Sequence, residues 1–238
     1  MIVSKEIKGS FYLHNGYPLP LMYDRYQLGF YEHILEVGAK AFDCAFMMHS
    51  KVLFSVFNIN YPLGIMYPSG NHEFSMCVKS WMKWLRENKY SPICVWVREY
   101  GDGDQDQDEI SKHHYHLALW VDGHRYQSIW SVGCKLEELW HRWLHLAPFI
   151  NTGLVHYRTA EHNKVCIHRV RMYQQEEFCR AFKNFSYLAK IHSKEKYPPK
   201  DKNILGGTEV NRLYNQLLQQ WRTFPPVDES EPYLEDEP

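Results

Sequence analysis

The chain has 238 residues, 45% of them hydrophobic and 16% aromatic, so it can bury a core as one domain with extensions or as two small domains. No stretch approaches the roughly 18 to 20 uncharged apolar residues of a membrane span. Lys5, Glu6 and Lys8 interrupt the apolar start too early for a secretory signal, so we expect a soluble intracellular protein. Six cysteines without a Cys-x-x-Cys pair indicate reduced thiols, and the net charge of −1 is unlike that of most nucleic-acid-binding proteins.

The first part of the chain predicts helix, strand and helix. Apolar side chains recur at helix-like intervals over residues 22–49, which predicts one or two amphipathic helices. We therefore treat residues 1–44 as an N-terminal helical extension. Residues 51–61 are rich in aromatic and β-branched side chains and predict a strand. Helical spacing of the apolar residues returns over 74–85.

The middle of the chain predicts a β-hairpin followed by a helix. Residues 92–100 and 113–121 are strand-like runs, and the segment between them, 101–112, is acidic and contains glycine, as in a solvated hairpin tip. A tryptophan-rich helical pattern then covers about 136–146.

The last third predicts two strands and two helices. Residues 154–157 and 165–170 read as strands, 174–191 as a helix, and 208–221 as a C-terminal helix within the segment 201–224. This order of elements predicts an α+β fold in which helices cover an antiparallel sheet of about five strands.

The acidic end of the chain accounts for its low net charge. Residues 228–238 hold six acidic groups and no Lys or Arg, so residues 1–227 carry 27 basic and 22 acidic groups, a net charge of +5. With four prolines as well, residues 225–238 are expected to form a disordered acidic tail. The remaining chain is basic enough to contact phosphates.

The predicted hairpin carries a candidate metal site. Because side chains alternate faces along a strand, His114 and His116 stand on one face of the strand 113–121. If the hairpin pairs so that Glu99 lies beside them, the three side chains form a two-histidine, one-carboxylate site with open positions for water and phosphate. Mg²⁺ or Mn²⁺ would suit an enzyme that acts on a phosphodiester.

The predicted helix 174–191 carries a candidate nucleophile. At about 100° per residue, one helix face is apolar and Tyr187 lies on the opposite one. Cations near a phenol favour its phenolate form and neutralise an attacked phosphate. Four basic residues fall within roughly 60° of Tyr187 if the helix continues for one more turn, namely Arg180, Lys183, Lys190 and Lys194.

These motifs resemble those of a known class of enzymes. His114-Tyr115-His116 resembles the His-hydrophobe-His motif of the HUH endonucleases, and Tyr187-Leu188-Ala189-Lys190 resembles their Tyr-x-x-Lys motif, in the same order. Glu99 resembles the acidic metal ligand of viral and plasmid initiators. The amino-acid sequence around these motifs is most similar to that of prophage-encoded, inovirus-type replication initiation proteins.

The resemblance covers about residues 45–200, which we take as the HUH endonuclease domain, and implies an RRM-like antiparallel sheet. It implies that Tyr187, assisted by Lys190, attacks single-stranded DNA at a replication origin in the cytoplasm of a bacterial host. The enzyme would stay on the 5′ phosphate and release a 3′ hydroxyl for host replication machinery, without a membrane partner. Residues 54–60 match the family's first motif only as a strand, so no functional residue is predicted there.

Three alternatives to this interpretation stay open. The chain can be a nuclease-inactive DNA-binding regulator on the same fold, or a metal-dependent nuclease that uses water in place of Tyr187. A second nucleophile among the seventeen tyrosines is also open. By contrast, His141 and His145 have the spacing of a zincin pair, but Arg142 replaces the general-base glutamate, so we interpret them as ordinary helix-face residues.

Overall fold

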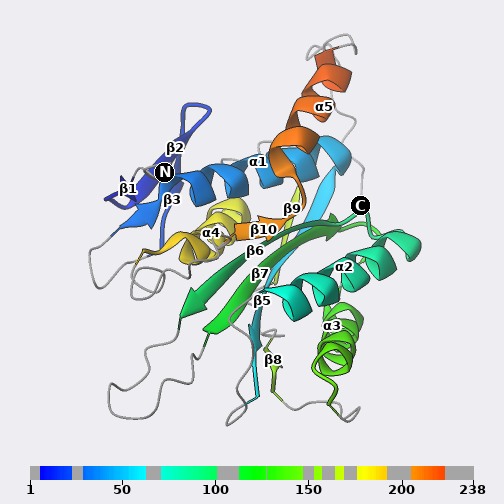
Figure 1. The fold of residues 1–238 in the computed structure, drawn as a ribbon. Helices are drawn as coiled ribbons and strands as arrows, with labels where there is room; N and C mark the ends of the chain where they lie inside the picture. The colour runs from blue at the N-terminus through cyan, green and yellow to red at the C-terminus, as the bar shows by residue number, and fades with distance from the viewer. Residues whose placement is uncertain are drawn as a thin grey trace, which may run out of the picture.

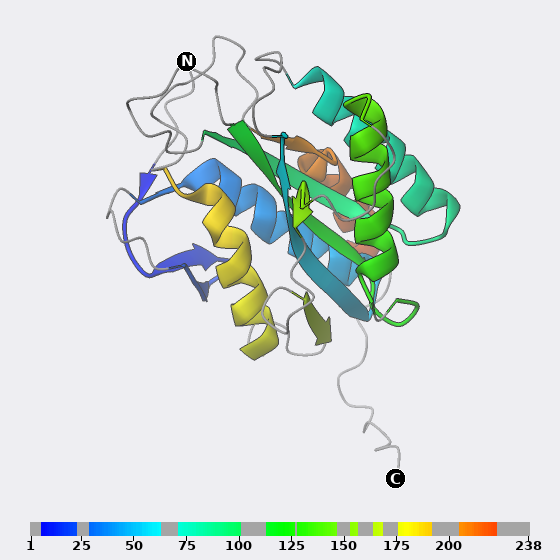
Figure 2. The same cartoon turned by 90° about the horizontal axis from the view of Figure 1, so that it is seen from below.

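The structure is a computed structural model. It describes residues 6–22, 29–62, 71–100, 113–126, 128–146, 153–156, 164–168, 176–191 and 205–222. Within these ranges, helices cover both faces of one antiparallel sheet (Figures 1 and 2), which confirms the expected α+β class. The acidic segment 101–112, the tail 225–238 and Lys194 lie outside the described residues.

The main sheet has six strands among the described residues, one more than the approximate number expected. Its order is β10-β6-β7-β5-β8, and β9 also pairs with β5. Every one of these pairings is antiparallel. The strands are β5 (Lys51–Asn60), β6 (Ile93–Tyr100), β7 (His113–Asp122), β8 (Val155–His156), β9 (Lys164–His168) and β10 (Leu205–Gly207).

Within this sheet, β10 is the strand that the sequence did not predict, because glycine is depleted in strands. Its two glycines are required by packing. A Cβ atom on Gly206 would overlap the ring of Trp96, and Gly207 has a φ of +120° and lies against the backbone of Cys94. Thr208 joins the same edge of the sheet to β6, since its backbone N–H donates to the carbonyl of Cys94 at a distance of 2.7 Å.

Two helical layers enclose the sheet (Figure 2). The helices α1 and α4 cover one face, with α5 packed on α1, and α2 and α3 cover the other. Successive side chains of β7 point to opposite faces of the sheet, so this strand contributes to the hydrophobic core on each face. Trp120 packs with α1, and Leu119 lies in the core formed with α2 and α3. The bounds are α1 (Glu32–Met48), α2 (His72–Glu87), α3 (Trp130–Trp143), α4 (Glu176–Ser186) and α5 (Val210–Arg222).

The N-terminal part differs from the expected helical extension. Residues 6–22 and 29–31 contain four short strands, and α1 is a buried part of the main core. The missed signal is Asn15-Gly16, which joins two of these strands with positive φ at both residues, as a two-residue hairpin turn requires. The strands are β1 (Glu6–Ile7), β2 (Phe11–His14), β3 (Tyr17–Pro20) and β4 (Phe30–Tyr31).

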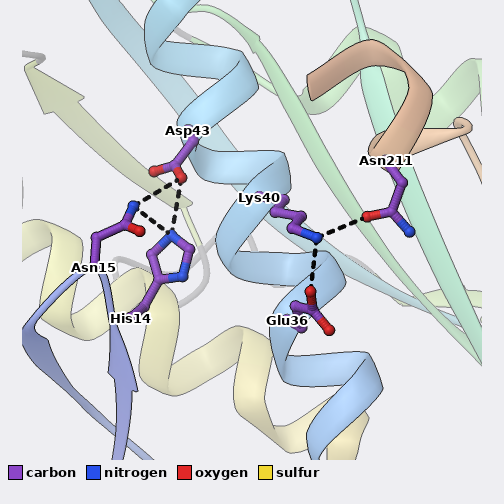
Figure 3. Close-up of polar contacts among 6 residues, drawn as sticks. All are labelled: His14, Asn15, Glu36, Lys40, Asp43 and Asn211. Carbon is purple, nitrogen blue, oxygen red and sulfur yellow. Dashed lines mark hydrogen bonds and ion pairs between the residues drawn. The ribbon is translucent and has the colours of Figure 1, made fainter. Parts of the chain in front are cut away.

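Polar contacts join this N-terminal hairpin to α1 (Figure 3). Nε2 of His14 lies 2.8 Å from a carboxylate oxygen of Asp43, and both residues are buried. Nearer the start of α1, the ammonium of Lys40 donates to Glu36 at 2.6 Å and to Asn211 of α5 at 3.1 Å. Solvent screens the exposed Lys40 contacts, whereas the contact between His14 and Asp43 is shielded from water.

The remaining expectations from composition concern membranes and cysteines. None of the helices in the described ranges combines the length and apolar character that crossing a bilayer requires. All six cysteines are described and free, which agrees with the expected reduced thiols. Burial raises the pKa of the Cys44 thiol to about 12, and the neighbouring Asp43 carboxylate adds to this shift. Cys44 is therefore a packing residue and a poor nucleophile.

Gly38 provides a test of how α1 packs against α4. A methyl group at this position would overlap the ring of Phe185, which is fully buried. We expect Gly38→Ala to lower the free energy of unfolding by about 1–3 kcal/mol, despite the better helix propensity of alanine. Urea unfolding measures this change. In a Phe185→Leu background the penalty should fall by half or more, whereas equal penalties in both backgrounds would contradict the proposed clash.

Candidate metal centre and tyrosine site

The pairing of β6 with β7 brings the predicted metal ligands together. Glu99 lies opposite His114, and Val97 lies opposite His116. Because side chains alternate along each strand, Glu99 and both histidines point to the face that α1 and α4 cover. The sequence prediction that these three residues share one face of the hairpin is confirmed.

The three side chains converge within hydrogen-bonding range. The carboxylate oxygen Oε2 of Glu99 lies 3.0 Å from Nε2 of His116 and 3.5 Å from Nε2 of His114, and the two Nε2 atoms are 3.1 Å apart. Glu99 is 1% exposed and His116 4%, while His114 is partly exposed. The group therefore has a buried side and a side that opens toward solvent.

These distances fit a bound divalent cation. Ligands at right angles around an ion with bonds of about 2.1 Å lie about 3.0 Å apart, which is close to the three separations observed. A carboxylate and two imidazoles on one side of an ion leave further positions open. Among the described residues, Glu99, His114 and His116 form the group whose ligand atoms can hold a metal ion.

Asn58 is a polar neighbour of this group that the sequence did not predict. It lies opposite His116 on β5, and its Oδ1 is 2.6 Å from Nδ1 of His116. The available signal was an asparagine in a strand whose neighbours Phe57 and Ile59 are apolar and buried. Its partner became evident only from the pairing of β5 with β7.

Tyr187 lies beside the candidate metal centre. Its ring centre is 5.1 Å from that of His116, with the two rings close to perpendicular, and the side chain is 40% exposed. The ammonium nitrogen of Lys190 is 5.1 Å from the centre of the Tyr187 ring. Two motifs separated by about seventy residues in the sequence thus meet at one place.

The segment around Tyr187 departs from the predicted helix 174–191. The α-helix ends at Ser186, and Tyr187–Ala189 forms a 3₁₀ turn. The reason is tertiary, because the backbone N–H of Met22 donates to Oγ of Ser186 at 2.7 Å, and Lys190 forms a β-bridge with Phe30. Tyr187 is therefore fixed in a turn between α4 and the N-terminal segment.

The predicted basic residues divide into three groups. Arg180 and Lys183 are exposed on α4, and Lys190 is partly buried against the Tyr187 ring. Lys194 lies outside the described residues, and the α-helix that would have carried it beside Tyr187 has ended by then. Of the four predicted cations, the structure thus places three on the same segment as Tyr187, namely Arg180, Lys183 and Lys190.

The zincin interpretation of His141 and His145 fails in the structure. His141 is 3% exposed within α3, whereas His145 lies beyond the end of that helix with a φ of +54°. Helix α3 begins at Trp130 and ends at Trp143, earlier than the predicted 136–146. The two imidazoles therefore do not share a helix face. The rejection of a zincin pair from Arg142 agrees with this, but the expectation that His145 lies on the helix face was wrong.

Fold and site together define an α+β protein with a carboxylate–histidine group suited to a metal ion and a tyrosine beside it. A family model described as the YagK/YfjJ C-terminal domain matches residues 19–203. The chain therefore belongs to the YagK/YfjJ C-terminal domain family. No curated protein and no solved structure matches it.

Proposed function

We propose that the chain is a metal-dependent DNA nicking and joining enzyme of the HUH class, which initiates rolling-circle replication of a phage or plasmid-like element. The observation that carries the proposal is the 5.1 Å separation between the rings of Tyr187 and His116, beside a group suited to a metal ion. The motif order supports the same class. We also interpret the β5, β6 and β7 core of the sheet as its RRM-like part.

In this proposal Tyr187 is the nucleophile. Its phenolic oxygen forms a bond to the phosphorus of a single-stranded phosphodiester, and the bond from phosphorus to the 3′ oxygen breaks. The phenol gives up its proton and the departing oxygen gains one, so the reaction exchanges one phosphate ester for another. The 5′ end stays on the protein, and a free 3′ hydroxyl is released. The reverse reaction rejoins a strand.

The residues around Tyr187 would bind the phosphate and the ion. Glu99, His114 and His116 would hold Mg²⁺ or Mn²⁺, which when bound supplies polarisation of the phosphoryl oxygens. Lys190, at 5.1 Å from the Tyr187 ring, adds positive charge where the phosphate would lie. The exposed Arg180 and Lys183 would contact phosphates farther along the strand.

The partners follow from this chemistry. The substrate is single-stranded DNA at a replication origin, and the released 3′ hydroxyl would serve the replication machinery of a bacterial host. The proposed setting is therefore the host cytoplasm.

The proposal is tested with single-stranded DNA from the genomic region around the gene, incubated with Mn²⁺ and resolved on a denaturing gel. DNA labelled at its 3′ end should move with the protein, because the downstream fragment keeps its label and its 5′ phosphate is bound to Tyr187. DNA labelled at its 5′ end should give a free, shorter product that a polymerase can extend.

The alternatives give different patterns on the same gel. A nuclease that uses water releases both labelled fragments free of protein. A nuclease-inactive DNA-binding protein leaves both substrates intact. Either pattern, obtained with DNA that the protein binds, would contradict the proposed nicking and joining mechanism.

A further inference from the structure

Asn58 occupies an unusual place for an amide side chain. It lies near the end of β5, between the buried apolar residues Phe57 and Ile59. The side chains of Phe57 and Ile59 point to the opposite face of the sheet, while Asn58 is partly buried and faces His116. Asparagine is depleted in strands, and a partly buried amide loses contacts with water unless it finds a hydrogen-bond partner. Its Oδ1 meets Nδ1 of His116 at 2.6 Å, so this contact compensates for placing the amide there.

The chemistry of the contact determines which nitrogen of His116 carries a proton. An amide oxygen can only accept a hydrogen bond, so Nδ1 of His116 is the donor. In a neutral imidazole with a proton on Nδ1, Nε2 presents its lone pair. The Nε2 atom lies 3.0 Å from Oε2 of Glu99 and 3.1 Å from Nε2 of His114, so a cation between these atoms would meet this lone pair.

The same contact fixes the orientation of the ring. Turning the His116 ring over would exchange Nδ1 with a carbon atom and would also exchange Nε2 with a carbon atom. The bond to Asn58 and the approach to Glu99 would both be lost. The Tyr187 ring packs against the His116 ring from a different element, with the two ring centres 5.1 Å apart.

We propose that Asn58 is a positioning residue for the metal centre, because it holds His116 with Nδ1 protonated and Nε2 directed at the ion. This inference rests on the metal-binding part of the proposed function. Partners that bind the second nitrogen of a metal-ligating histidine typically change metal affinity by about 10- to 100-fold. Asn58 would act through His116 and would not touch the DNA.

Metal affinity is the first test. Mn²⁺ binding to the full chain, followed by calorimetry, should weaken about 10- to 100-fold in Asn58→Leu, which keeps the size of the side chain but lacks the acceptor. Asn58→Asp keeps an acceptor and should bind Mn²⁺ at least as tightly as the unchanged protein. The control is Asn88→Leu, at the exposed C-terminal end of α2 on the other side of the sheet, with a change below about twofold.

The protonation of His116 is the second test, and it needs neither metal nor DNA. Proton–nitrogen NMR of histidine-labelled protein in EDTA should show a proton on Nδ1 of His116 and a change of that signal in Asn58→Leu. A His116→Gln variant assigns the signal among the fourteen histidines. Because this readout is independent of activity, it reports on Asn58 even if nicking is never observed.

The outcomes separate the two proposals. The assignment of Asn58 would be overturned if Nδ1 of His116 carried no proton. It would also be overturned if Asn58→Leu and the unchanged protein bound Mn²⁺ with equal affinity. If the unchanged protein binds no Mn²⁺ at all, the proposed function is contradicted, and the NMR signal still decides whether Asn58 fixes the imidazole. If Asn58→Leu does not fold, the inference rests on Asn58→Asp, in which loss of Mn²⁺ affinity would contradict it.

Discussion

Tyr187→Phe should abolish the covalent protein–DNA adduct and lower nicking by at least about a thousandfold. The variant keeps the ring that lies 5.1 Å from His116 but loses the oxygen that would bond to phosphorus. Since Tyr187 is 40% exposed, the substitution should change the free energy of unfolding by about 0.5 kcal/mol or less. Mn²⁺ affinity and single-strand DNA affinity should stay within about twofold. Adduct yield on a denaturing gel measures the main effect.

Tyr17 provides a matched control for this experiment. It is 42% exposed, nearly the same as Tyr187, but it lies on the N-terminal hairpin strand β3. Tyr17→Phe should leave the adduct unchanged. If the adduct were to persist in Tyr187→Phe, the nucleophile would be another of the seventeen tyrosines.

Loss of both imidazoles from the candidate metal centre should have a comparably large effect. In His114→Gln/His116→Gln, a hydrogen-bond donor still faces the buried carboxylate of Glu99, which limits the destabilisation that an unpartnered buried charge would cause. Mn²⁺ binding should fall below detection, and adduct formation should fall by at least about a thousandfold. DNA affinity should drop less than about threefold, because in the proposed function phosphate contacts elsewhere, with Arg180 and Lys183 among them, would supply most of the binding.

His156→Gln is the control for metal binding. His156 lies on β8 opposite Asn58, on the same sheet but outside the candidate metal group, and it is exposed. Mn²⁺ affinity should be unchanged in this variant. Adduct formation by the unchanged protein in EDTA would contradict the requirement for a metal ion, whatever the double variant does.

The candidate metal group could be predicted from the sequence because it depends on local geometry. Alternation along one strand places His114 and His116 on the same face, and the hairpin then needs only one register to bring Glu99 beside them. Asn58 could not be predicted in this way. Its bond to His116 spans 58 positions, and nothing in the residues around Asn58 specifies which strand pairs with β5.

The environment of Tyr187 shows a second limit of local patterns. Helical periodicity predicts the apolar face of α4 well, since Phe178, Phe182 and Phe185 are all buried. Periodicity does not predict where the helix stops, because contacts at its end come from distant residues such as Met22, which is 164 positions from Ser186 in the sequence. Tertiary contacts override helix propensity at such points.

The most direct test of the nicking mechanism is to identify the amino acid that becomes bonded to DNA. Trypsin cleavage after Lys183 and Lys190 yields a peptide of residues 184–190, in which Tyr187 is the sole tyrosine. After the adduct is digested with nuclease and trypsin, mass spectrometry should find this peptide carrying a 5′-phosphorylated nucleotide on Tyr187. A nucleotide on any other residue, or an unmodified 184–190 peptide together with cleaved DNA, would contradict the proposed mechanism.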